Sequence, residues 1–186
     1  MINKLEGFSL TIKMCLIGAG RAGMVDANNF EYYVTESTIT TVVDLSEEKA
    51  KEASAKLNAD QYYTDLDRAL EAGNFQAVII GAPTFAHSKA VIKSAKAGKD
   101  IFCEKPLTIT LKEADEMEKA IKANDVKFQI GFMRRFDKNF LRAKEIIERG
   151  DIGDIMLIKS VGRGPGLPPE WYADINKSNG LLAEVN

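Results

Sequence analysis

The sequence predicts an α/β fold with a doubly wound parallel sheet. Between Lys13 and Gly131, apolar runs of strand length alternate with segments of helix length, which is the pattern of right-handed βαβ units. The first apolar run passes directly into a glycine-rich turn at Gly18–Gly23, and the second ends in a carboxylate, Asp44. Glycines at this spacing, with an acid about 20 residues further on, are typical of a Rossmann dinucleotide-binding unit.

Local patterns place the individual elements in order along the chain. Apolar and β-branched runs predict strands over residues 14–17, 39–44, 61–63, 77–80, 101–103 and 127–131. Capping residues and terminal Gly or Asn residues predict helices over 46–57, from Asp65 to Gly73, over 85–97, and from a capping box at Thr110–Glu113 to about Asn124. The run at 77–80 is continuously apolar, as expected of a strand buried on both faces.

Each glycine of the first turn has a separate physical task. Gly18 allows the chain to turn tightly off the strand, and Gly20 removes a side chain so that a pyrophosphate can approach the backbone. Gly23 lets the following helix pack closely on the sheet, and the N–H groups at the helix start bind the anion. The alternative is an ordinary tight turn, which the Asp44 context disfavours. We therefore expect the chain to bind a dinucleotide.

Asp44 indicates which dinucleotide. A carboxylate at the end of the second strand accepts hydrogen bonds from the adenosine ribose diol and repels a 2′-phosphate. Leu45 and Ser46 follow, without an arginine to receive such a phosphate. An alternative role for Asp44 is to cap the next helix, but Ser46 suits that position better. We therefore predict NAD rather than NADP.

The composition indicates a soluble globular protein. Of the 186 residues, 45% are hydrophobic and 28% charged, and the net charge of −2 is spread along the chain. We expect no nucleic-acid partner, since there is no basic stripe, and no membrane partner, since no apolar run approaches about 20 residues. The leader lacks the apolar segment of a secretory signal. Cys15 and Cys103 are expected as reduced core residues of a cytoplasmic protein, and no metal site is expected.

The alternation of strand and helix patterns ends after Gly131. We expect a dinucleotide-binding domain over 11–131 and, over 132–186, a linking helix and the incomplete beginning of an α+β substrate and oligomerisation domain. The helix is predicted at Phe136–Arg149 and a strand at Ile155–Val161, before a Gly/Pro-rich loop at Gly162–Pro169. Because that strand would have an open edge, we predict that it pairs with another chain or drives self-association.

Two further loops are expected in the same crevice as the glycine turn. Gly81-Ala82-Pro83-Thr84 follows the fourth predicted strand, and Glu104-Lys105-Pro106 follows the fifth. In a doubly wound sheet, ligands bind at the carboxyl ends of the strands. A lysine facing an oxidised nicotinamide is suited to proton relay near neutral pH. Alone, a Glu-Lys-Pro tripeptide is most often a surface turn, and its position after the fifth strand is what makes it specific.

These motifs together resemble a known family. Gly18–Gly23, Asp44, Ala82-Pro83-Thr84-x-x-His87, Glu104-Lys105-Pro106 and Gly131–Asp137 are similar, in order and spacing, to the Gfo/Idh/MocA family of NAD(P)-dependent oxidoreductases, most closely its inositol 2-dehydrogenase branch. The resemblance implies NAD-dependent oxidation of a secondary alcohol on a cyclic polyol or sugar. It also implies a homo-oligomer formed through the C-terminal domain.

The resemblance assigns roles to individual residues. Lys105 is implied to contact the reacting oxygen and to join the proton relay, and the Ala82–Thr84 loop to lie along the nicotinamide. His87 matches a family histidine, for which a structural hydrogen bond is an equal alternative to cofactor contact. The implied cofactor-binding residues are Gly18, Gly20, Arg21, Ala22, Gly23, Asp44, Ala82, Pro83, Thr84, His87, Glu104 and Lys105, and the implied catalytic residues are Lys105 and Glu184.

Two departures from the family pattern bear on activity. The family loop usually reads Thr-Pro-Asn where this chain has Ala82-Pro83-Thr84. Glu184 occupies the acidic position of an acid-x-x-x-His motif whose histidine, the expected general base, would fall two residues beyond Asn186. We therefore expect weak or no activity from these 186 residues. The alternatives are a non-catalytic NAD-binding or sensing module and, less well matched by the Glu-Lys-Pro loop, an S-adenosylmethionine-dependent methyltransferase.

Overall fold

The computed structural model describes residues 11–162, 170–178 and 180 of the chain. The chain divides into two compact units, Met1–Ile130 and Gly131–Asn186. The first unit carries the sheet and all of the loops predicted to bind the cofactor.

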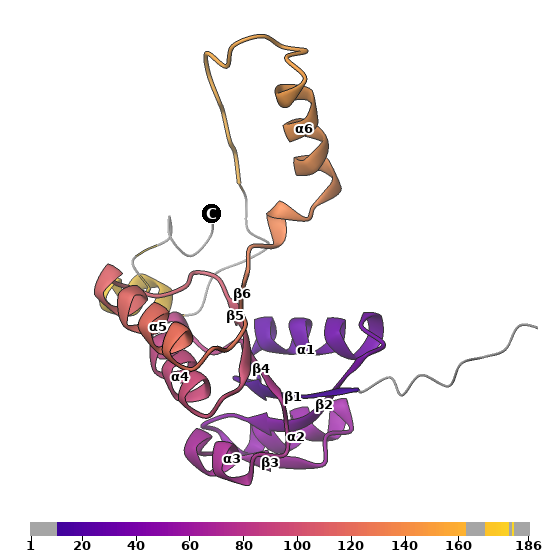
Figure 1. Cartoon of the computed structure of the whole chain (residues 1–186), viewed down its shortest axis with the longest axis vertical. Helices are drawn as coiled ribbons and strands as arrows, with labels where there is room; N and C mark the ends of the chain where they lie inside the picture. Colours follow the sequence, from indigo (N-terminus) through magenta and orange to yellow (C-terminus); the bar gives the residue numbers. More distant parts are fainter. Residues whose placement is uncertain (1–10, 163–169, 179, 181–186) are drawn as a thin grey trace, which may run out of the picture. The chain divides into compact units, whose positions relative to one another are not determined.

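The first unit contains a six-stranded parallel sheet in the order β3-β2-β1-β4-β5-β6 (Figure 1). The strands are β1 (Ile12–Ile17), β2 (Ser37–Val43), β3 (Gln61–Tyr63), β4 (Ala77–Ile80), β5 (Asp100–Glu104) and β6 (Phe128–Gly131). Each predicted strand is confirmed to within two residues at both ends. The chain order reverses between β1 and β4. In sheets of this type the reversal opens a ligand-binding crevice at the carboxyl ends of the central strands.

The helices of this unit are α1 (Arg21–Tyr33), α2 (Glu47–Leu57), α3 (Leu66–Ala72), α4 (Thr84–Lys96) and α5 (Leu111–Ala123). The four helices whose bounds the sequence predicts lie within one residue of those bounds, and α1 begins inside the glycine turn. Ser46 caps α2 by accepting a hydrogen bond from the Lys49 N–H, and Asp65 caps α3. The predicted capping box is confirmed, with Thr110 and Glu113 bonded reciprocally at the start of α5.

The core has two halves because side chains alternate across a strand. Met14 and Leu16 of β1 pack toward α1 and α2, in a cluster that includes Ala27 and Leu57. Their neighbours Cys15 and Ile17 point the other way, into the cluster that α3, α4 and α5 complete. Figure 1 shows α4 and α5 lying side by side, and these two helices make direct contact. The sheet is thus covered on both faces, as a parallel sheet requires.

Cys15 and Cys103 are both buried and unbonded to each other, as predicted for core residues. Burial raises the pKa of each thiol above its ordinary value, so both stay protonated at neutral pH. Within the described part of the chain, no helix combines the length and the apolar character needed to cross a membrane.

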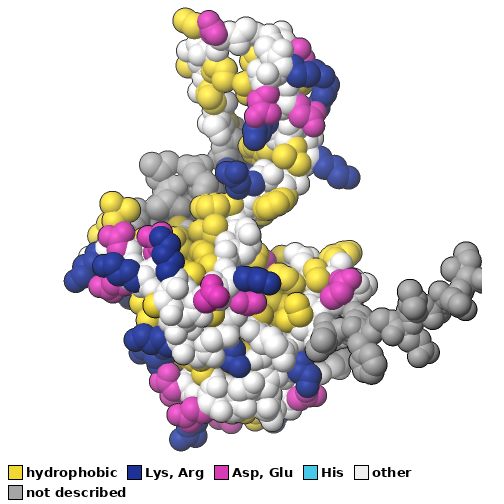
Figure 2. Space-filling view, in the orientation of Figure 1, with side chains coloured by type: hydrophobic (Ala, Val, Ile, Leu, Met, Phe, Trp, Pro, Cys, Tyr) yellow, Lys and Arg dark blue, Asp and Glu magenta, His cyan; other side chains and the backbone are white. Residues whose placement is uncertain are grey.

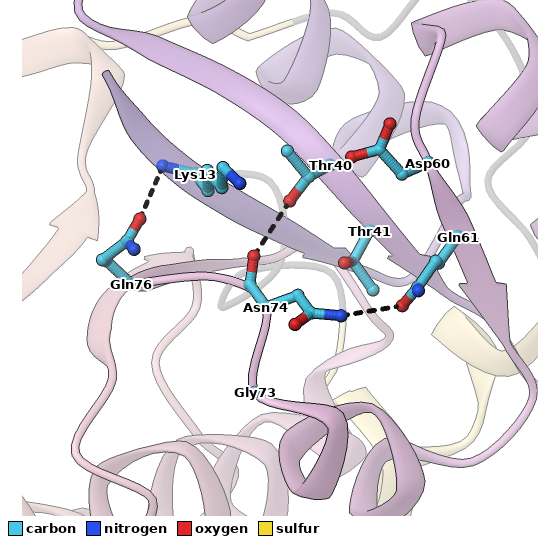
Figure 3. Close-up of a pocket in the computed structure, with 8 residues that line it drawn as sticks. All are labelled: Lys13, Thr40, Thr41, Asp60, Gln61, Gly73, Asn74 and Gln76. Carbon is cyan, nitrogen blue, oxygen red and sulfur yellow. Dashed lines mark hydrogen bonds between the residues drawn. The ribbon is translucent and has the colours of Figure 1, made fainter. Parts of the chain in front are cut away.

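The amino-terminal edge of the sheet carries a polar cavity of about 350 Å³ (Figure 3). It lies beside a register shift between β1 and β2, where Thr40 is skipped in the pairing. The polar groups around it bond to one another. The Lys13 N–H donates to Gln76 Oε1 at 2.8 Å, and Asn74 Nδ2 donates to Gln61 Oε1 at 3.3 Å. This edge is opposite to the carboxyl ends of the strands, so the cavity is separate from the predicted cofactor site.

The described part of the second unit contains short helices and no strand. It comprises η1 (Met133–Arg135), α6 (Lys138–Glu148), η2 (Glu170–Ala173) and α7 (Ile175–Ser178). The predicted linking helix is confirmed but begins later than Phe136, because Asp137 is its N-cap and accepts from the N–H groups of Asn139 and Phe140. Most of the predicted Gly162–Pro169 loop, and Glu184, lie outside the described residues.

The predicted strand at Ile155–Val161 is wrong. These residues form neither strand nor helix and are exposed. An apolar, β-branched run favours an extended chain, but a strand forms only by hydrogen bonding to a neighbour, and the described residues give it no such partner. Figure 2 shows apolar side chains at the surface of the segment that carries α6, where Phe140 is 55% exposed and Leu141 43%.

Candidate functional site

Three loops at the carboxyl ends of β1, β4 and β5 form the candidate site. The backbones of the first two approach each other closely. A Cβ on Gly18 would lie 2.6 Å from the Ala82 Cα, and Gly18 has φ +92°, which favours glycine. A Cβ on Gly23 would lie 2.1 Å from the Gly18 carbonyl oxygen, and one on Gly81 would lie 2.3 Å from the Gly23 Cα. Gly18, Gly23 and Gly81 therefore form a junction in which no side chain fits; we call it the glycine junction.

Gly20 differs from the other glycines of the motif. A Cβ placed on it would meet nothing within 4 Å, so the space above it is open. It is the N-cap of α1, and no side chain caps the helix. The first N–H groups of a helix have no partner within it and favour an anion. The open approach at Gly20 and the uncapped start of α1 fit a pyrophosphate, which is the role the sequence predicts for this turn.

Asp44 lies directly after β2 and beside the glycine turn. Its Oδ2 accepts from the Ala19 N–H at 2.9 Å, and its Oδ1 accepts from the Ser46 N–H at 2.9 Å. These bonds orient the carboxylate while leaving each oxygen a second lone pair. The N-cap of α2 is Ser46, so Asp44 does not hold that position. This geometry fits a carboxylate that accepts hydrogen bonds from a ribose diol.

His87 connects the second loop to the third. The side chain is 1% exposed. Its Nε2 lies 2.7 Å from the Ala82 carbonyl oxygen, and its Nδ1 lies 2.9 Å from the Pro106 carbonyl oxygen. Carbonyl oxygens only accept, and a neutral imidazole carries one N–H, so in either neutral tautomer His87 donates to one of the two carbonyls and its other nitrogen lies in contact with the second. His87 thus contacts both the loop after β4 and the loop after β5.

The third loop places Glu104 and Lys105 at the end of β5. Both residues are half-buried. Glu104 Oε2 accepts from the Lys105 N–H at 3.0 Å, and the Lys105–Pro106 peptide is cis. Further along, the Glu113 carboxylate accepts from the Thr108 hydroxyl at 2.7 Å, and this bond lowers the pKa of Glu113. Side chains of the protein therefore hold the loop at both of its ends.

The structure distinguishes residues that the sequence analysis grouped together. Arg21 and Ala22 are exposed at the start of α1, whereas Thr84 is 3% exposed. In the Ala82–Thr84 loop the most accessible residue is Pro83. Among the described residues, no group of three or more His, Cys, Asp or Glu side chains is placed to hold a metal.

Sequence reasoning missed two residues at this site. Gly81 begins the loop after the fourth strand, and the signal for it was a glycine immediately after a fully apolar strand. Asp26 lies on α1 and is half-buried. The signal for Asp26 was an acid near the start of the helix that packs on the sheet.

A family model describing an oxidoreductase family with an NAD-binding Rossmann fold, Gfo/Idh/MocA, matches residues 12–132. The chain belongs to this family. The match covers both the glycine turn and the Glu-Lys-Pro loop, and it confirms the resemblance predicted from the motifs. NAD is the cofactor of the matched domain.

Individual members of the Gfo/Idh/MocA family show the same similarity. The chain is 35% identical to myo-inositol 2-dehydrogenase of Thermotoga maritima and 34% identical to the NAD(+)-dependent scyllo-inositol 2-dehydrogenase of Bacillus subtilis. In each case the alignment covers 94% of this chain and 51% of the relative. The chain therefore spans about half the length of these curated relatives.

A solved structure extends the comparison to the fold. Scyllo-inositol dehydrogenase from Lactobacillus casei, with bound NAD(H) and scyllo-inositol, superposes with a TM-score of 0.73 at 29% identity. The superposition covers 77% of this chain and 43% of that one.

Gly20 and Gly23 are predicted to respond differently to alanine. Gly23→Ala should lower the free energy of unfolding by about 1–3 kcal/mol, because its Cβ overlaps the Gly18 carbonyl. Gly20→Ala should change it by less than about 1 kcal/mol but weaken NAD binding about tenfold or more, equivalent to roughly 1.4 kcal/mol. Urea unfolding and calorimetric titration measure the two quantities. Equal effects of the two substitutions on both quantities would contradict this assignment.

His87 is predicted to stabilise both loops that it contacts. His87→Phe keeps a buried ring but removes both nitrogens from the Ala82 and Pro106 carbonyls, and should cost about 1–3 kcal/mol of unfolding free energy. Hydrogen exchange should accelerate at residues 82–84 and 104–107 and stay unchanged in β2. His87→Gln, which keeps a donor group, should lose less. Unchanged exchange in both loops of the Phe variant would refute the role.

Proposed function

We propose that this chain is the cofactor-binding part of an NAD-dependent dehydrogenase. The proposed reaction is oxidation of a secondary alcohol on a cyclic polyol or sugar of the inositol type. One observation carries the proposal: the glycine junction and His87 bring the Glu104-Lys105-Pro106 loop to the same edge of the sheet as the dinucleotide-binding turn. The inositol dehydrogenases among the relatives support the substrate class.

The residues of the glycine turn bind and orient in this proposal. The N–H groups at the start of α1 hold the pyrophosphate above Gly20, and Asp44 accepts hydrogen bonds from the adenosine ribose. NAD, when bound, accepts a hydride from the carbon that carries the alcohol. Ala82 and Pro83 line the path of the nicotinamide half, and the buried His87 keeps their loop in place. Holding the reacting groups at a fixed distance is the main catalytic contribution of such a scaffold.

Lys105 moves the proton. As hydride leaves an alcohol carbon, its hydroxyl loses a proton, and a lysine near the positively charged nicotinamide ring is suited to the relay. The Glu104 carboxylate holds the Lys105 N–H, and this bond fixes the backbone from which the lysine extends. Glu184 is proposed as the acidic member of the substrate-side motif, on the strength of the resemblance alone.

The remaining assignments concern the whole protein. Homo-oligomerisation through the second unit and a cytoplasmic location are proposed from the family resemblance. A polyol or sugar is the proposed small-molecule partner. The competing function is a non-catalytic NAD-binding or sensing module, which would bind NAD in the same way without turnover.

NADH formation with a panel of inositols and hexoses tests the proposal. We expect turnover from the product of the full open reading frame that contains this sequence, and weak or no turnover from the 186 residues alone. Lys105→Met in the active form should lower the rate by about 10²–10⁴-fold and change NAD affinity by no more than a few-fold. The matched control is Lys112→Met, since Lys112 is exposed in the first turn of α5.

Two outcomes would contradict the proposal. NAD binding without turnover on any polyol, by either form of the protein, would favour the non-catalytic module. A Lys105 variant with the rate of the Lys112 control would remove Lys105 from the proton relay.

A further inference from the structure

The polar cavity at the amino-terminal edge of the sheet has no part in the proposed function. Its volume of about 350 Å³ lies at the lower end of the range of small-molecule sites in proteins. The lining comes from β1, β2, the start of β3 and the loop between α3 and β4, and every side chain in it is polar (Figure 3). The proposed NAD site lies at the opposite edge of the sheet. The cavity is therefore a separate feature of this unit.

A bulge in β2 turns two successive threonines toward this cavity. Side chains of a regular strand alternate between the two faces of a sheet, but the pairing of β2 with β1 steps from Ile39 directly to Thr41 and skips Thr40. Ile39 and Val42 consequently both pack in the core cluster beside α1 and α2, and the two threonines between them both line the cavity. Bulges are rare in parallel pairs, and they are over-represented at functional sites, where they re-aim a side chain.

Thr41 is the most buried side chain of the lining. It is 1% exposed, and Thr40 is 8% exposed. The Thr40 hydroxyl donates to the Asn74 carbonyl oxygen at 3.5 Å, whereas the Thr41 hydroxyl forms no hydrogen bond within the described part of the chain. A buried hydroxyl without a protein partner is costly unless a molecule in the cavity bonds to it. The bulge thus directs a free hydroxyl at the occupant of the cavity.

The two glutamines of the lining have their oxygens occupied and their nitrogens free. Gln61 Oε1 accepts from the Tyr63 hydroxyl at 2.7 Å and from Asn74 Nδ2 at 3.3 Å. Gln76 Oε1 accepts from the Lys13 N–H at 2.8 Å. The NH₂ groups of both glutamines remain as donors, and neither has a partner among the described residues. These bonds hold the two carboxamides in a fixed orientation beside the cavity.

The charges of the lining indicate a neutral ligand. Lys13 supplies an ammonium and Asp60 a carboxylate, and neither forms an ion pair within the described part of the chain. An anion in the cavity would meet the Asp60 carboxylate, and a cation would meet the Lys13 ammonium. A hydroxyl group both donates and accepts, so a neutral molecule with several hydroxyls can use the ammonium and amide donors together with the carboxylate acceptor. Because no apolar residue lines the cavity, an apolar ligand is disfavoured.

We propose that this cavity is a second ligand site, which binds a neutral polyhydroxylated molecule of about the size of a monosaccharide. The Thr41 hydroxyl, the NH₂ groups of Gln61 and Gln76, and the Asp60 carboxylate hold the ligand by hydrogen bonds. A molecule bound there lies at the edge of the sheet opposite to the proposed hydride transfer. The inference therefore does not depend on the proposed dehydrogenase activity.

Amide chemical shifts of the 186-residue chain, recorded by NMR during titration with myo-inositol and with D-glucose, test the inference. With at least one of the two probes we expect saturable shifts at Thr41, Gln61 and Asn74. The affinity should be in the millimolar range, because each hydrogen bond to the ligand replaces one to water. The same shifts should appear in the presence of saturating NAD, since the two sites are separate.

Two variants identify the groups that bind. Thr41→Val keeps the volume of the side chain but removes its hydroxyl, and should weaken binding about three- to tenfold, the effect of losing one hydrogen bond between uncharged groups. Asp60→Ala should weaken it about tenfold or more, because a charged acceptor is lost. Asp60 is exposed, so this variant provides a second route if Thr41→Val folds poorly. The matched control is Thr38→Val, the same change on β2 at a residue outside the lining, which should keep the wild-type affinity.

Three results would overturn the inference. The first is the absence of saturable shifts around the cavity with both probes, including the case in which only residues 18–23 and 104–107 respond. The second is an affinity in Thr41→Val and Asp60→Ala equal to that of the Thr38→Val control. The third is a tighter response to sodium sulfate than to either polyol at matched ionic strength, which would make the cavity an anion site.

Discussion

The close approach of backbones at the glycine junction is the constraint on which the rest of the site depends. Gly18, Gly23 and Gly81 leave no room for a Cβ between the β1 turn, the start of α1 and the end of β4. This approach brings the Ala82–Thr84 loop against the dinucleotide-binding turn. It also aims the uncapped start of α1 at the carboxyl edge of the sheet. Any side chain larger than hydrogen at these positions would separate the elements that must act on one ligand.

Polar side chains extend this contact to the third loop. The buried His87 contacts the carbonyl oxygens of Ala82 and Pro106, and Glu104 accepts a hydrogen bond from the Lys105 N–H. These side chains are buried or half-buried, where hydrogen bonds are strong and unsatisfied polar groups are costly. The site is therefore held by a small number of polar contacts beneath its surface, while the groups proposed to face the ligand remain accessible. Such support keeps a catalytic lysine in place without occupying the space of its substrate.

The sequence predicted what local signals specify. Strand and helix bounds, the caps at Ser46 and Asp65, and the positions of the glycine turn and the Glu-Lys-Pro loop all follow from residues close together in the chain. The close approach of Gly81 to Gly23 arises from packing between distant segments, which no local pattern reports. The strand prediction at Ile155–Val161 was wrong for the same reason. Its composition favours extension, but a pairing partner is a property of the tertiary structure.

The central claim is that the edge formed by these loops binds NAD, with Asp44 recognising the adenosine ribose. Calorimetric titration of the 186-residue chain with NAD and with NADP tests it most directly. The account predicts that NAD binds and that NADP binds at least about tenfold more weakly, a difference of roughly 1.4 kcal/mol, because its phosphate meets the Asp44 carboxylate. In Asp44→Ala this preference should disappear. Equal affinity for the two dinucleotides in the wild-type chain, or no binding of either, would contradict it.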